Sequence, residues 1–315
     1  MDFSLDEEQQ AVAELAGRIL DEQEDRERAW AELAKANLLG LCLPEDVGGS
    51  GYGFVEACLL FEQAGRTVAP VPLVPTLVTA MAVAEWGTPQ QRQEWLPGVA
   101  AGGVVLTADP AGSRANVPWA NLAAAIVLVS DDSVRIADTA ELTLTRQDTT
   151  SGEPQFMVQD LGAGGRMGGA QAAEWIRQRW TVALCAVQVG TCDRAMRMTA
   201  EYVAGRHQFD RPIGSFQAVG QRLADAYIDV EAMRLTMWQA AWRLAHGLPS
   251  DEEVAIAKYW ASDGGQRVCA AAQHLHGGIG VALDYPLHRH TLLAKQIELT
   301  LGSGTPQLVA LGEML

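Results

Sequence analysis

The chain has 315 residues, 48% of them hydrophobic, which is enough for a large core and more than one domain. Its formal net charge of −16 argues against a nucleic-acid partner, and a polyanionic ligand would need a local basic patch. Five scattered cysteines without a CxxC pair predict buried thiols in a reducing cytoplasm. The acidic start is not a signal peptide and no apolar run approaches the ~20 residues of a membrane span, so we expect a soluble cytoplasmic protein.

The first hundred residues have the periodicity of helices. Residues 6–20 place Val12, Leu15 and Ile19 on one face, and Thr88 followed by Pro89 is typical of a helix start. Further helices are expected at 27–37 and at 54–65, and another is expected to end at Trp86. They are separated by a glycine-rich break at 38–53 and an extended turn with Pro70, Pro72 and Pro75.

The pattern changes near Gly102 to short runs of β-type residues. Strands are expected at 104–107, 125–129, 134–136, 142–145 and 156–159, which together predict a small β-domain. The glycine-rich stretch 162–169 follows it. Because its spacing is not GxGxxG and no partner acid follows, a domain hinge is favoured over a dinucleotide-binding loop.

From residue 170 onward the sequence is helical again, with segments at 170–205, 216–246, 251–275 and 285–300 and a short terminal piece. These lengths suit a four-helix bundle. The methionine and tryptophan residues between 233 and 244 indicate a buried bundle or subunit interface, and an apolar ligand pocket is the alternative. The predicted fold is therefore α+β and mainly α: a helical domain (1–104), a short β-domain (105–165) and a helical bundle (166–315).

The most distinctive stretch is Arg206–Gln217, where Pro212 and Gly214 predict a bend between two helices. Ser215 is the expected N-cap of the second helix. The bend presents Arg206 and nearby glutamine and aromatic side chains, and arginine suits a phosphate group. An ordinary helical hairpin with a surface arginine is the alternative interpretation.

Two His-x-His pairs, His274/His276 and His288/His290, are poor chelators on a helix because residues i and i+2 point apart. We therefore predict no metal site. The glycines that follow, from Gly277, are expected to end a helix and to allow close approach of a backbone or a cofactor. No catalytic residue can be assigned from the pattern alone.

These motifs together resemble the acyl-CoA dehydrogenase family along nearly the whole chain. The resemblance rests on residues 43–53 and 61–66, on a degraded motif at 107–113, and on the glycine turn at 274–280. The stretch from Arg206 to Gln217 is the most specific match.

The resemblance implies FAD as cofactor and an acyl-CoA as substrate, with electron-transfer flavoprotein as the usual acceptor. It also implies that the arginine motif contacts the pyrophosphate and the flavin, and that the glycine turn reaches FAD bound mainly by a neighbouring subunit. The cofactor-binding residues carried over are Arg206, Gln208, Phe209, Phe216, Gln217, His274, Gly277 and Gly278.

The sequence departs from the family at the catalytic base, which is usually a glutamate. Ser303 stands at its usual position near the C-terminus, and His246 falls at the alternative position taken from an ungapped alignment. The β-domain is also short, with no clear counterpart of the loop beside the flavin. This pattern resembles the small subunits of actinobacterial heterotetrameric acyl-CoA dehydrogenases that act on steroid-derived CoA thioesters.

That resemblance implies an α2β2 assembly in which a longer homologous subunit brings the glutamate and this chain completes the FAD site. Two alternatives stay open. One is a homo-oligomeric flavoenzyme with an atypical base such as His246. The other is a non-catalytic assembly subunit with a decayed flavin site.

Overall fold

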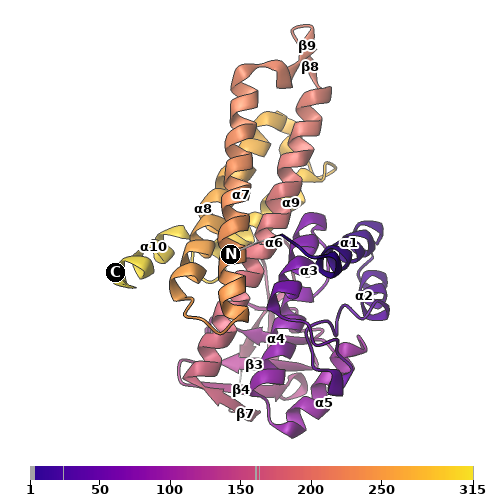
Figure 1. Ribbon diagram of the computed structural model, residues 1–315, viewed down its shortest axis with the longest axis vertical. Helices are drawn as coiled ribbons and strands as arrows, with labels where there is room; N and C mark the ends of the chain where they lie inside the picture. Colours follow the sequence, from indigo (N-terminus) through magenta and orange to yellow (C-terminus); the bar gives the residue numbers. More distant parts are fainter. Residues whose placement is uncertain (1–3, 24, 160–161, 163, 315) are drawn as a thin grey trace. The chain divides into compact units, whose positions relative to one another are not determined.

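The computed structural model in Figure 1 describes residues 4–23, 25–159, 162 and 164–314. The chain divides into two compact units. The first is formed by Met1–Phe61 and Ala69–Ala183, and the second by Glu62–Val68 and Leu184–Leu315. Each unit has its own core. The three-domain boundaries expected from the sequence stay a prediction.

Helices form the first part of the first unit, and reciprocal capping boxes fix where two of them begin. Asp6 and Gln9 form a reciprocal capping box, and so do Thr88 and Gln91. Pro89 follows Thr88 at the first helical position, as predicted. The helical elements are α1 (Glu7–Glu22), α2 (Arg26–Lys35), the 3-10 turn η1 (Glu45–Val47), α3 (Phe54–Thr67), α4 (Leu73–Trp86) and α5 (Pro89–Ala100); the last residues of α3 belong to the second unit.

Helix α4 corrects the expectation of an extended turn through Pro75. Pro72 precedes the helix and Pro75 lies inside its first turn. Proline is tolerated there because the first backbone N–H groups of a helix have no partner within the helix. Residues 73–80 are buried on every side, so α4 is a core helix of the first unit.

Two small sheets complete the first unit. The first has the order β1-β3-β4-β7, in which β1 and β3 are parallel and the other pairs antiparallel; the second has the antiparallel order β2-β6-β5. The strands are β1 (Leu106–Asp109), β2 (Val117–Pro118), β3 (Ala125–Val129), β4 (Ser133–Asp138), β5 (Thr143–Gln147), β6 (Gln155–Gln159) and β7 (Gly165–Gly169), with the 3-10 turn η2 (Thr139–Glu141) after β4.

The core of the β-region contains side chains from both sheets. Every residue of β3 is buried, which fits its continuous apolar run. Ile126 and Leu128 pack in one cluster with Phe156 and Val158. The glycine-rich residues 165–169 were expected to act as a hinge, but they form β7, an edge strand held to β4 by backbone pairing; Ala163, in the same stretch, lies outside the described residues.

The second unit is a helical bundle, as predicted. Its elements are the C-terminal part of α6 (Ala170–Gly205), the hairpin β8 (His207–Gln208) and β9 (Arg211–Pro212), η3 (Ile213–Ser215), α7 (Gln217–Ala245), α8 (Asp251–His276), η4 (Gly277–Val281), α9 (Leu287–Leu299) and α10 (Gly304–Met314).

Buried polar contacts join the helices of this bundle. The fully buried Gln188 of α6 donates from Nε2 to Ala261 O of α8 (3.0 Å) and Ala294 O of α9 (3.4 Å). Met233 and Met237 of α7 are buried, which confirms the predicted bundle core. The order of helices, small sheets and helices confirms the mainly α fold class.

Candidate functional site

The Arg206 motif folds into a two-stranded hairpin between α6 and α7, at one end of the second unit (Figure 1). The backbone N–H of Arg206 donates to Tyr202 O (2.8 Å), which ends α6. Its carbonyl accepts from Ile213 N (2.8 Å) and closes the hairpin. Gly214 lies close to α6, because a Cβ there would be 3.2 Å from Val203 O. The bend expected from Pro212 and Gly214 is therefore present as a hairpin.

The tip of this hairpin has unusual backbone geometry. Phe209 and Asp210 both have left-handed φ angles, of 53° and 60°, as a two-residue turn of type I′ requires at its two central positions. Aspartate tolerates this conformation, but for a bulky aromatic residue it is uncommon. The Phe209 side chain is also 86% exposed. A strained, exposed aromatic residue at a turn is a candidate contact for a ligand or partner.

Phe216 lies between two other side chains of the motif. The Arg211 guanidinium is 4.0 Å from the centroid of the Phe216 ring, and Phe209 meets the same ring edge-on at 6.3 Å. Among the described residues, no hydrogen bond or ion pair reaches the exposed Arg206 side chain. The hairpin therefore presents one cation already placed over a ring and a second without an internal partner.

The expected cap of α7 was wrong. Ser215 lies in η3, where its hydroxyl donates to Pro212 O (2.7 Å), and Phe216 takes the N-cap position without a side-chain hydrogen bond. Gln217 is the first residue of the helix and is exposed. Tyr227 and Ile228, further along α7, are 55% and 62% exposed. The first part of α7 thus leaves apolar side chains uncovered in a single chain.

The glycine turn ends α8. Gly277 has φ 65° and ψ −143°, a conformation that glycine adopts and other residues avoid. A Cβ at Gly277 or Gly278 would meet nothing within 4 Å, so the backbone there is open to an incoming group. His274 is exposed as well.

His276 is not among the predicted cofactor-binding residues, although it lies within the glycine turn at 274–280. It is 4% exposed and stacks on Tyr202, with ring centroids 4.4 Å apart. Its Nδ1 donates to Ala272 O (2.8 Å), and its Nε2 lies 3.0 Å from the Tyr285 hydroxyl. His276, directly before the two glycines, therefore contacts Tyr202 near the end of α6, four residues before Arg206. Its position directly before two glycines is the sequence signal that could have drawn attention to it.

The two positions considered for a base lie elsewhere in the second unit. His246 caps the C-terminal end of α7, with Nδ1 donating to Trp242 O (2.7 Å). The 29 residues of α7 separate it from the Arg206 hairpin by about 42 Å along the helix axis. Ser303 lies in the loop between α9 and α10. His246 and the Arg206 hairpin of one chain therefore lie at opposite ends of α7.

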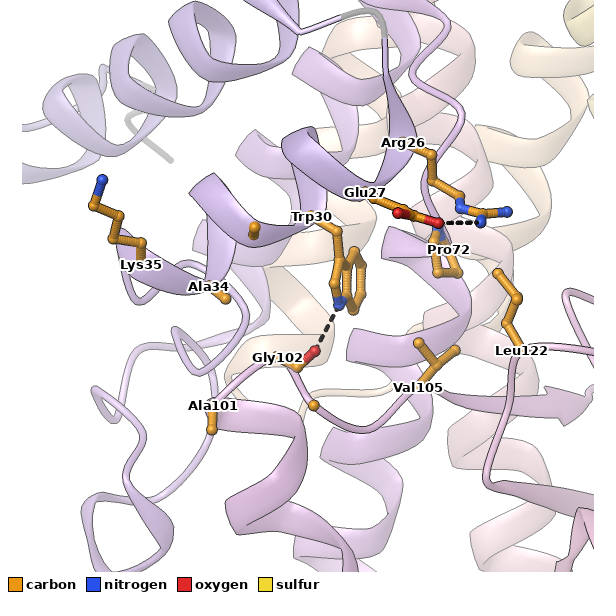
Figure 2. A pocket seen from close by; sticks show the side chains of 12 residues that line it. Arg26, Glu27, Trp30, Ala34, Lys35, Pro72, Ala101, Gly102, Val105 and Leu122 are labelled. Atoms are coloured by element: carbon orange, nitrogen blue, oxygen red, sulfur yellow. Dashed lines mark hydrogen bonds and ion pairs between the residues drawn. The ribbon is translucent and has the colours of Figure 1, made fainter.

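A cavity of about 610 Å³ in the first unit is lined by α2 and the segment after α5 (Figure 2). Its polar side chains already have partners. Trp30 Nε1 donates to Gly102 O (2.9 Å), and Arg26 forms an ion pair with Glu27 (3.5 Å). The remaining walls are apolar, including Val105 and Leu122. Most catalytic sites contain several converging polar groups, so this cavity is a poor candidate for a catalytic site.

In the part of the chain that the structure describes, no three His, Cys, Asp or Glu side chains are grouped as metal ligands. The same residues contain no helix that is long and apolar enough to cross a bilayer.

Comparisons with known proteins assign the family. Residues 6–103 match the N-terminal domain model of acyl-CoA dehydrogenase, and residues 168–313 match the C-terminal domain model. Acyl-CoA dehydrogenase FadE27 of Mycobacterium tuberculosis is 37% identical, over 94% of this chain and 90% of the relative. The chain belongs to the acyl-CoA dehydrogenase family, whose members are flavin-dependent oxidoreductases.

Two solved structures are similar in both sequence and fold. The ChsE4–ChsE5 complex from Mycobacterium tuberculosis has a TM-score of 0.93 at 35% identity, covering 99% of this chain and 98% of that one. The Tcur3481–Tcur3483 steroid acyl-CoA dehydrogenase G363A variant has a TM-score of 0.90 at 37% identity, covering 98% and 97%. The FAD and proline complex of PigA is 18% identical with a TM-score of 0.88, which shows the shared fold alone.

Proposed function

We propose that this chain is the flavin-completing subunit of a heteromeric acyl-CoA dehydrogenase and that a longer homologous subunit supplies the glutamate base. One observation carries the proposal. His276 links the glycine turn to Tyr202, four residues before the exposed Arg206, whereas Ser303 and His246, at the two expected base positions, have no carboxyl group. The residues expected to bind FAD are present, while the carboxylate expected to act as base is missing.

The exposed residues fit an anionic cofactor. Arg206 offers a guanidinium that can bind a phosphate through two parallel hydrogen bonds. The turn at Gly277 and Gly278 leaves room for close approach to its backbone. In this chain of net charge −16, Arg206 and Arg211 provide the local basic patch that a dinucleotide pyrophosphate needs.

When bound, FAD would supply the hydride acceptor for α,β-dehydrogenation of an acyl-CoA. Arg206 and Gln208 would hold its phosphate groups, and Phe209, Phe216 and Gln217 would cover the flavin and exclude water. His274 and the turn after it would contact a flavin held mainly by the partner, whose glutamate would remove the α-proton. The proposal also includes an α2β2 assembly, a steroid-derived acyl-CoA as substrate, electron-transfer flavoprotein as acceptor and a cytoplasmic location. The similarity to the ChsE4–ChsE5 complex supports the heteromer, and the similarity to a steroid acyl-CoA dehydrogenase supports the substrate.

The test is co-expression with the homologous subunit and titration of the purified complex with FAD, before and after Arg206→Ala. Charge-assisted hydrogen bonds contribute about 1.5–3 kcal/mol, so we expect FAD affinity to fall about 10- to 100-fold. Arg18→Ala, which removes an exposed arginine of α1, is the control and should leave the affinity unchanged. Unchanged affinity in Arg206→Ala would refute the assigned flavin contact.

Two further results discriminate the alternatives. If the chain alone binds stoichiometric FAD and oxidises acyl-CoAs, the partner role is wrong, and loss of turnover with retained flavin in His246→Ala would then identify the base. A colourless complex would instead indicate an assembly subunit without a working flavin site.

A further inference from the structure

His276 occupies a buried position where three segments of the second unit meet. Its ring lies 4.4 Å from the Tyr202 ring of α6, nearly parallel at 20°, and 5.2 Å from the Tyr285 ring before α9. Tyr285 also packs against a small apolar cluster that includes Met198, Ala272 and Leu287. From the end of α8, His276 therefore contacts both α6 and the segment before α9.

The hydrogen bonds define the form of the imidazole. A backbone carbonyl only accepts, so the Nδ1 atom facing Ala272 O must carry the proton. Nε2 is then free of hydrogen in the neutral ring and accepts from the Tyr285 hydroxyl. Burial lowers the pKa of His276, although the hydrogen bond to Ala272 O opposes that effect. The neutral ring therefore uses both nitrogens, one toward α8 and one toward the segment after the glycine turn.

This junction lies between the two segments assigned to the flavin. Tyr202 accepts the hydrogen bond from Arg206 N that ends α6. On the other side, Gly277 follows His276 directly and turns the chain with a positive φ. Gly280 then returns to the same side chain, because a Cβ there would be 3.0 Å from His276 Cβ.

We infer that His276 is a positioning residue for the flavin site: its stacking on Tyr202 and its hydrogen bond with Tyr285 hold the glycine turn in a fixed place relative to the Arg206 end of α6. The expected loss of FAD affinity rests on the proposed function, because a misplaced glycine turn would weaken its contact with the flavin. A purely apolar side chain would fill the same space but would leave the Tyr285 hydroxyl without this acceptor.

The test compares three single variants and one double variant of the purified complex. His276→Phe keeps an aromatic ring against Tyr202 and removes both hydrogen bonds. His276→Gln offers an amide oxygen to the Tyr285 hydroxyl again. Tyr285→Phe removes the same hydrogen bond from the opposite side and serves as the matched variant.

Three measurements follow for each variant: the FAD dissociation constant, amide hydrogen exchange over residues 202–213 and 277–285, and the melting temperature without flavin. One net hydrogen bond contributes about 1 kcal/mol, so His276→Phe and Tyr285→Phe should each weaken FAD binding about 5-fold. Exchange should rise in both peptide ranges, and His276→Gln should restore both values. The double variant His276→Phe/Tyr285→Phe should lose no more FAD affinity than His276→Phe alone, because His276→Phe has already removed the bond to Tyr285.

Several results would overturn the inference. A residue that only fills the core would lower the melting temperature and leave the FAD dissociation constant and the paired exchange pattern unchanged. If His276→Gln weakened FAD binding as much as His276→Phe does, the role of Nε2 as acceptor would also be contradicted. Failure of the proposed function is seen separately, as unchanged FAD affinity in Arg206→Ala, and the exchange measurement then still decides whether His276 positions the turn.

Discussion

Arg234 is central to an ion-pair network within the second unit, and its removal gives the sharpest stability prediction. The guanidinium pairs with Glu62, with Asp193 (3.6 Å) and with Glu231 (3.5 Å). Glu62 and Asp193 are only 15% and 11% exposed, so Arg234→Met leaves two poorly hydrated carboxylates without their shared cation. Breaking a buried pair costs about 3–5 kcal/mol. Because Arg234 is itself 23% exposed, we expect a loss near the lower end, about 3 kcal/mol.

Arg197→Met is the matched control. Arg197 pairs with the same Asp193 at 2.7 Å, but its side chain is 62% exposed. Exposed pairs contribute about 0–1 kcal/mol, so this variant should lose at most that amount. Chemical unfolding of both variants at one protein concentration measures the difference. Equal losses in the two variants would refute the argument that burial decides the cost.

Proton uptake provides a second check on the same network. Burial raises the pKa of Glu62, and Arg234 opposes that rise. Without Arg234 the pKa of Glu62 rises further, so the ionised carboxylate is costly at pH 7 and is relieved by protonation as the pH falls. The deficit of Arg234→Met should therefore shrink between pH 7 and pH 5. A deficit that grows on acidification would contradict this sign.

Three other substitutions test the packing and the acid stability of the second unit. Gly190→Ala would place a Cβ 1.9 Å from Glu62 O, so chemical unfolding should show a loss of about 3 kcal/mol, whereas Gly220→Ala, which meets nothing within 4 Å, should gain about 0.5–1 kcal/mol; similar effects at both glycines would contradict the packing argument. Burial, and then the charges of neighbouring cations, lowers the pKa of His290 to about 4, so the unfolded chain takes up a proton first. The neutral His290 ring contributes fully to the free energy of unfolding above pH 6.5, and this contribution decreases by about 3 kcal/mol toward pH 4. His290→Leu should remove this part of the pH dependence. Chemical unfolding at a series of pH values measures it.

Much of the fold could be predicted because its helices carry strong apolar periodicity. The segments 170–205, 216–246 and 251–275 agree with α6, α7 and α8 to within a few residues. Strand β7 was missed because its glycines have no side-chain pattern, so only backbone pairing with β4 reveals it. Ser215 offered a good cap signal, yet the hairpin geometry directs its hydroxyl to Pro212 O instead.

The candidate site was less accessible to physical reasoning from the sequence. Arg206 and Gly277 were assigned through the family resemblance, and their flavin contacts remain a prediction. His276 could not be separated from His274 by spacing, because its role depends on Tyr202, which is distant in the chain and close in the fold. The left-handed φ of Phe209 likewise follows from closing the hairpin, and its residue type would not suggest it.

The buried cysteines divide between the two units, with Cys42 and Cys58 in the first and Cys185, Cys192 and Cys269 in the second. Burial raises the pKa of the Cys42 thiol and brings that of Cys185 to about 12, so both resist alkylation while the chain is folded. Labelling then requires local or global opening of the surrounding unit. The cysteines therefore act as native reporters of unfolding, and peptide mapping of the labelled sites can time the opening of each unit without added probes.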